Sequence, residues 1–131
     1  MVEHYPIGTC VPKFVATVNK GFGITFQNGF TISVQWGTDN YCENRNLDID
    51  FEDLPNPKEA NRWESRNAEI AVFDKDGEIV QAGEDDDVIG WLTPDEVAKA
   101  IEIVSGYQGQ TMTGMTGEKY IKDTFKKYSI K

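Results

Sequence analysis

Apolar and polar residues alternate between positions 22 and 36, and this pattern predicts a β-hairpin. A period of two is typical of strands with one buried face. A two-residue Asn-Gly turn would divide the apolar residues between both faces. A three-residue loop at 27–29 instead pairs Phe26 with Phe30 and leaves Gly29 in the left-handed position of a bulged turn. The apolar positions on the resulting face are Phe22, Ile24, Phe26, Phe30, Ile32, Val34 and Trp36.

A second hairpin of the same kind is predicted for residues 68–82, with Gly77 as the left-handed residue of its turn. Apolar residues on both faces of this hairpin favour an interior strand. Shorter strands are predicted at 13–18 and 88–92. The expected register of the second hairpin pairs Val72 with Val80 and Ile70 with Ala82.

Two helices follow, at 94–105 and 117–128. The first begins with the capping box Thr93-Pro94-Asp95-Glu96, in which proline takes the first helical position. Residues 107–117 are rich in glycine and small polar residues and are interpreted as a flexible connector. The second helix carries its lysines away from its apolar side, and the pattern leaves open whether it docks on the sheet. Its apolar side holds Ile121, Phe125 and Tyr128.

These elements predict an α+β fold: an antiparallel sheet of about five to six strands, including two bulged hairpins, packed by one helix and a C-terminal helix. A length of 131 residues fits one domain, 1–131. Residues 37–66 are predicted to be a long acidic surface excursion. Long loops of this kind often carry function.

The net charge of −9 is unevenly distributed along the chain. Residues 39–53 hold six acids and one arginine, a net −5, and residues 84–87 are all acidic. This balance disfavours direct nucleic-acid binding and favours a partner protein with a basic surface. The chain shows neither a signal-peptide pattern nor an apolar run long enough for a membrane helix, so we expect a cytoplasmic protein with free cysteines.

The segment 38–45 is the densest group of chemically versatile side chains. It follows a well-defined strand, where binding loops are often mounted. A catalytic cysteine would need a nearby base, and the one histidine, His4, lies far away in sequence. The alternative is a loop whose tyrosine and cysteine pack inward. Its candidate binding residues are Asp39, Tyr41, Cys42, Glu43 and Arg45.

Two further groups are candidates for binding. Arg62 and Trp63 combine residue types that are common at interface hot spots, although Trp63 could equally hold the long loop against the core. Asp85, Asp86 and Asp87 could attract a cation, but the side chains of successive residues diverge, so a solvated turn is expected there. We therefore expect neither a metal site nor a cofactor.

Several motifs resemble a set of small phage and prophage proteins without an established activity. They are NGFTISVQWGTDNYCENR (28–45), SRNAEIAVFDKDGEIV (65–80) and DDVIGWLTPDEV (86–97). The resemblance covers about half of the chain and carries over no catalytic residue. It implies a virus-encoded accessory protein that acts in the bacterial cytoplasm.

The sequence thus favours a non-enzymatic acidic binding protein that engages or inhibits a host factor. One alternative is a protein that sequesters a small ligand such as a nucleotide signal. It requires a pocket in which aromatic residues (Trp36, Tyr41, Trp63 or Trp91) meet arginines (Arg45, Arg62 or Arg66). The other alternative is a small enzyme that uses Cys42.

Overall fold

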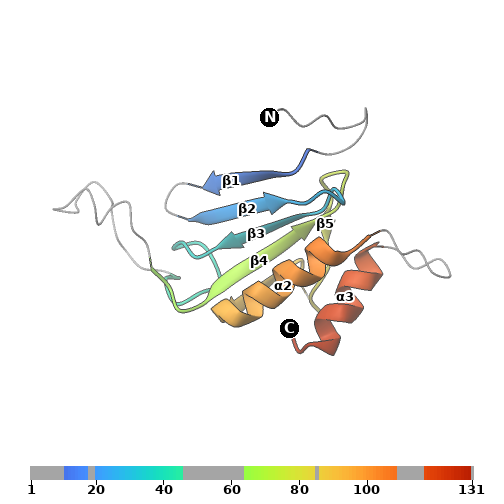
Figure 1. Ribbon diagram of the computed structural model, residues 1–131. Coiled ribbons are helices and arrows are strands. Elements are labelled where there is room, and N and C mark those ends of the chain that lie inside the picture. The colour runs from blue at the N-terminus through green and yellow to red at the C-terminus, as the bar shows by residue number, and fades with distance from the viewer. Residues whose placement is uncertain (1–10, 18–19, 46–63, 85, 109–116, 131) are drawn as a thin grey trace.

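The computed structural model describes residues 11–17, 20–45, 64–84, 86–108 and 117–130. They form an antiparallel sheet with helices on one of its faces, an α+β fold (Figure 1). The strands follow the order β1-β2-β3-β4-β5, and β6 also pairs with β4. The elements are β1 Lys13–Thr17, β2 Gly21–Thr25, β3 Thr31–Gln35, β4 Ala68–Phe73, β5 Ile79–Val80, β6 Val88–Leu92, α2 Pro94–Gly106 and α3 Gly117–Lys127.

The β2–β3 hairpin has the predicted register and turn. The Phe26 N–H donates to the Phe30 carbonyl at 2.9 Å, and Gly29 has φ +89°. Ile24 pairs with Ile32. The even-numbered residues of β2 and β3 therefore share the face toward the helices, where Ile32 is fully buried.

Strand β4 lies inside the sheet, as predicted, and two strands share its far edge. Val72 pairs with Val80 of β5 around a turn in which Gly77 has φ +80°. The expected pairing of Ile70 with Ala82 is wrong, because Ile70 pairs with Ile89 of β6. Strand β5 ends after two residues, and β6 takes over the remainder of that edge.

Strand β6 contains a β-bulge near its end. Its register on β4 shifts by one residue between the pairs Ala68–Leu92 and Ile70–Ile89. Gly90 and Trp91 therefore lie opposite the single residue Glu69. A bulge of this kind redirects the side chains beside it.

Helix α2 begins as the sequence predicts, with both hydrogen bonds of its capping box in place. It packs on β3, β4 and β6. Helix α3 docks against α2 and the core, which settles the question that the sequence left open, because Ile121 and Phe125 are fully buried. Tyr128, expected on the apolar side of this helix, is 48% exposed, and the core instead receives Ile130.

The predicted connector 107–117 lies mostly outside the described residues, but its first residue belongs to the core. The ring of Tyr107 is 5.2 Å from the rings of both Phe30 and Tyr120. Of the predicted excursion 37–66, residues 37–45 and 64–66 are described.

One side chain joins the first hairpin to the end of α2. The Asn28 amide donates to the carbonyls of Val104 at 2.8 Å and Tyr107 at 2.7 Å. Its oxygen accepts from the N–H of Phe30 at 2.8 Å. Carbonyls at the end of a helix lack partners within the helix, so Asn28 supplies two donors that α2 needs.

Replacing Asn28 with alanine is therefore expected to lower the free energy of unfolding by about 2 kcal/mol, because it removes one donor from each of the two carbonyls and the acceptor of the Phe30 N–H. Urea denaturation measures the effect. The control is Gln27→Ala in the same turn, at an exposed side chain, which should change stability by less than about 0.5 kcal/mol. Equal losses in both variants would contradict this role for Asn28.

Candidate functional site

Residues 37–45, here called the docked loop, are held against the sheet by their own polar side chains. The Asn40 side chain accepts from the Gly37 N–H at 2.8 Å. The Asn44 amide donates to the carbonyls of Trp36 at 2.8 Å and Glu64 at 2.9 Å. Asn44 is only 6% exposed, so its amide gives these two carbonyls, one at each end of the excursion, the hydrogen bonds that water would otherwise make.

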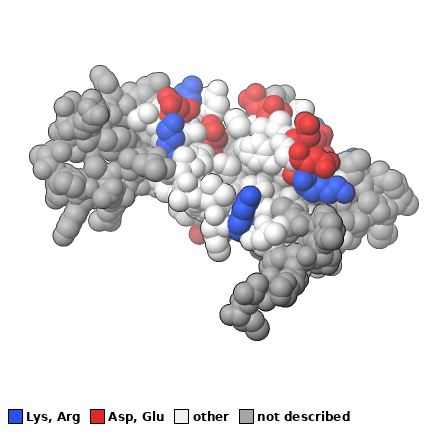
Figure 2. All heavy atoms as spheres, turned by 90° about the horizontal axis from the view of Figure 1, so that it is seen from above, with Lys and Arg blue, Asp and Glu red and all other residues white. Residues whose placement is uncertain are grey.

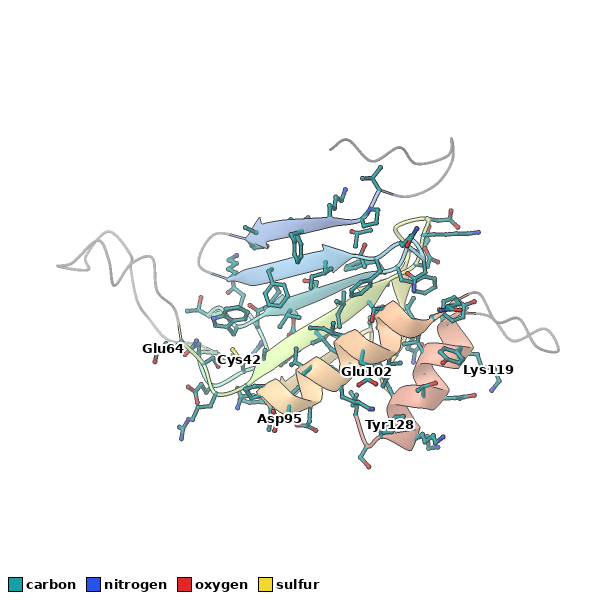
Figure 3. The ribbon with its side chains drawn as sticks, viewed as in Figure 1. Cys42, Glu64, Asp95, Glu102, Lys119 and Tyr128 are labelled. Atoms are coloured by element: carbon teal, nitrogen blue, oxygen red, sulfur yellow. The ribbon has the colours of Figure 1, made fainter. Side chains whose placement is uncertain are left out.

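Cys42 lies inside the docked loop and is fully buried. Its thiol donates to the Gly37 carbonyl at 3.4 Å. Figure 3 shows the sulfur turned inward at the end of the sheet where β3 ends. The inward-packing interpretation therefore holds for the cysteine, whose side chain is shielded from solvent.

The β6 bulge and Glu69 hold the docked loop in place. The Glu69 carboxylate accepts from the Tyr41 N–H at 2.8 Å and from the Asn40 amide at 3.2 Å. The Trp91 N–H donates to the Tyr41 carbonyl at 2.9 Å. A Cβ atom on Gly90 would lie 2.3 Å from the Cβ of Tyr41, so only glycine allows this approach.

Tyr41, Arg45 and Trp91 gather at this corner, and we call them the aromatic patch. Tyr41 is 43% exposed and Trp91 is 55% exposed. The Arg45 guanidinium carbon lies 4.2 Å from the centre of the Tyr41 ring, a cation–π contact. The patch lies on the face of the sheet away from the helices, because its anchor Glu69 alternates with the core-facing Ile70.

The backbone of Trp91 is strained. Its φ is +60°, a left-handed conformation that costs a residue with a side chain roughly 1–2 kcal/mol. A glycine there would avoid this cost. The strained position instead carries a large apolar ring that is more than half exposed.

The acidic residues of the docked loop have basic neighbours within the chain. Glu43 accepts from the Arg66 guanidinium at 2.8 Å, and this hydrogen bond lowers the pKa of the Glu43 carboxyl. Asp39 lies 3.8 Å from the Lys20 ammonium. Both pairs are at the surface and contribute little to stability.

The acidic stretch 84–87 also has basic groups nearby. Asp86 and Asp87 are exposed, and Asp85 lies outside the described residues. Glu84 and Asp86 line a hollow of about 580 Å³ together with Lys122 and Lys126 of α3. Two lysines of α3 thus lie around the same hollow as two of these acids.

One groove among the described residues bears on the small-ligand alternative. Trp36 lines an apolar groove of about 280 Å³ on the helix side, with Pro94 and Ile101 of α2 among the other walls. The described residues that line this groove include no arginine. Tyr41 and Trp91 are not among the residues that line this groove.

Arg62 and Trp63 lie outside the described residues. Within the described ranges, no cluster of three or more His, Cys, Asp or Glu side chains could hold a metal ion. The same ranges contain no helix that is both long enough and apolar enough to span a membrane.

Sequence reasoning missed Glu69 and Gly90, and placed Trp91 only among possible ligand contacts. The available signal was Gly-Trp near the end of a predicted strand, since glycine within a strand often marks a bulge or a close backbone approach. Nothing local identified Glu69 as the anchor of a loop almost thirty positions earlier.

We compared the chain with protein-family models, with curated proteins and with solved structures, and none of the three comparisons gave a match.

Replacing Gly90 with alanine is expected to displace the docked loop, because the new methyl group collides with Tyr41. We expect a loss of about 1–3 kcal/mol in the free energy of unfolding, together with faster amide exchange in residues 40–45. The matched control is Gly106→Ala, where an added Cβ meets nothing within 4 Å. Unchanged exchange of the loop in Gly90→Ala would refute the close approach.

The Cys42 thiol is expected to resist alkylation in the folded protein because it is buried. The experiment uses a Cys10→Ser background, so that only Cys42 can react. Iodoacetamide labelling, read by mass spectrometry, should be slow in buffer and fast in denaturant. Rapid labelling in buffer would instead support a reactive thiol and the alternative of a small enzyme that uses Cys42.

Proposed function

We propose that this protein is a non-enzymatic binding protein that engages another protein through the aromatic patch. The observation that carries the proposal is Trp91, an exposed indole on a strained backbone. Strain of this kind persists where the surrounding structure enforces it, and it concentrates at functional sites.

The composition of the patch supports a protein partner. Tryptophan, tyrosine and arginine are the residue types most enriched at interface hot spots. Here Arg45 is already stacked on Tyr41 and also donates to the Asp39 carbonyl at 3.3 Å. A side chain that is ordered before binding loses less conformational entropy when the partner arrives.

The docked loop supports the patch in the way that a binding site requires. Hydrogen bonds tie its backbone to the Glu69 carboxylate and to the Trp91 N–H. In addition, the Glu43 N–H donates to the Asn67 side chain at 2.7 Å. Exposed anchors on such a scaffold keep their positions without the partner.

Charge gives the partner its expected character. The chain carries −9, so long-range attraction favours a protein with a basic surface and disfavours nucleic acid. The neighbouring acids Asp39 and Glu43 already have basic partners. We therefore propose that the net charge speeds association with the partner, whereas contacts of the aromatic patch supply the affinity. In the setting that the phage resemblance implies, the partner is a host factor in the bacterial cytoplasm.

The proposal is tested by affinity capture from host lysate, followed by calorimetry with the captured protein. Trp91→Gly should weaken binding at least about thirtyfold, the loss expected for a hot spot of 2 kcal/mol or more. Its free energy of unfolding should stay within about 1 kcal/mol of the parent, because the relief of strain offsets the lost contacts of the ring.

The matched control is Tyr128→Ala, an exposed aromatic on the last turns at the other end of the molecule (Figure 3). It should bind like the parent. Association should also slow as salt is added. Equal binding by Trp91→Gly and the parent would refute the patch, and a retained small molecule in native mass spectrometry would favour the ligand-sequestering alternative.

A further inference from the structure

We infer that β1 is a self-pairing edge, through which two copies of this chain join their sheets around a twofold axis at Val15. In the sheet as described, β1 pairs with β2 and has no strand on its other side (Figure 1). An open edge of this kind is a template for another strand.

The hydrogen bonds of the neighbouring strands show which groups of β1 face outward. The Phe26 N–H donates to the Phe30 carbonyl, and the Trp36 N–H donates to the Lys20 carbonyl. Even-numbered residues of β2 are therefore bonded to β3. Because the bonding direction alternates along an antiparallel strand, the odd-numbered residues of β2 face β1.

The register of β1 on β2 determines which residues of β1 face the open edge. Val15 pairs with Gly23, so Val15 directs its N–H and carbonyl toward β2. Phe14 and Ala16 direct theirs to the open edge. Pro12 has no N–H, which limits a new ladder to the residues that follow it.

These outward groups match their own copy in antiparallel orientation. Pairing Phe14 with Ala16 of the partner, and Ala16 with Phe14 of the partner, uses all four outward groups of each strand. Val15 then faces Val15 of the partner across the axis, and Lys13 faces Thr17 of the partner. No like charges stand opposite each other in this register.

The side chains of β1 also favour a second copy. Phe14 lies on the helix side beside Ile24, yet it is 83% exposed because α2 packs on β3, β4 and β6 and does not extend over β1. In the paired register the two Phe14 residues lie on one face, about 7–8 Å apart diagonally, within reach of aromatic contact.

Charge selects this edge among the surfaces of an acidic protein. Residues 11–17 contain one lysine and no acid, in a chain of net charge −9. Seen from the side of β1, the acidic atoms form several separate groups, the largest at the right, and much of the described surface between these groups is uncharged (Figure 2). Two copies can therefore meet here without placing carboxylates face to face.

A contact made through β1 alone is small. Five residues make a strand about 17 Å long. The interface therefore falls in the small class, below about 1,200 Å² in total. A reversible dimer in the micromolar range is expected, and salt should tighten it by screening the net charge of the two chains.

The test is sedimentation of the full chain over a range of concentrations, with two variants that add the same charge to β1. Val15→Glu places two carboxylates opposite each other and should weaken the dimer at least about fivefold. Thr17→Glu places a carboxylate opposite Lys13 of the partner and should tighten it about threefold. Equal effects of the two variants would overturn the register.

Hydrogen exchange gives a second readout that needs no variant. The amides of Phe14 and Ala16 should become protected as concentration rises, whereas that of Val15 should be protected throughout. Ala16→Pro removes an outward N–H without breaking a β1–β2 bond and should give a folded monomer by circular dichroism and sedimentation. A parent chain that stays monomeric up to millimolar concentration would refute the inference.

Discussion

The three-residue turn at 27–29 is the constraint on which the rest of the structure depends. Because Gly29 accepts a left-handed conformation, Phe26 and Phe30 pair, and every even position of the first hairpin faces the same side. A turn shorter by one residue would turn half of these side chains to the opposite face. The same turn presents Asn28 to the end of α2, so strand register and helix placement are determined together.

A second constraint follows from the way in which two strands share the edge of β4. Strand β5 pairs with the last residues of β4. Strand β6 pairs with the earlier residues of β4 and has a bulge opposite Glu69. The bulge places Gly90 and Trp91 on the face away from the helices, where the docked loop covers Gly90. One face of the sheet thus holds the core, and the other holds the aromatic patch.

The sequence was sufficient to predict those elements that depend on residues close together in the chain. The first hairpin and the capping box depend on residues a few positions apart, and both formed as expected. The pairing of Ile70 failed because β6, almost twenty residues away, competes for the same edge. The prediction that Tyr128 lies on the apolar side of α3 was wrong for a related reason. The chain turns after α3 and places Ile130 in the core instead.

The candidate site shows the same division. The sequence placed Tyr41, Cys42, Glu43 and Arg45 in one loop, but their roles depend on distant partners. Burial of Cys42 and the exposure of Tyr41 follow from anchors at Glu69, Gly90 and Trp91, which lie 24 or more positions further along the chain. Similarly, the Glu43 carboxylate forms an ion pair with Arg66, a residue that lies more than twenty positions later in the chain.

The strand order also relates the two proposed surfaces to each other. The aromatic patch lies at β6, on the far side of β4, and the open edge belongs to β1 at the other end of the strand order. A pair of chains joined through β1 would therefore leave both patches accessible at its outer edges. Two patches on one body turn the second contact with a dimeric or repetitive partner into an intramolecular step, which raises avidity without any new contact. A higher protein concentration would then give more dimer and thus stronger binding to such a partner. This coupling requires no contact between the β1 edge and the aromatic patch.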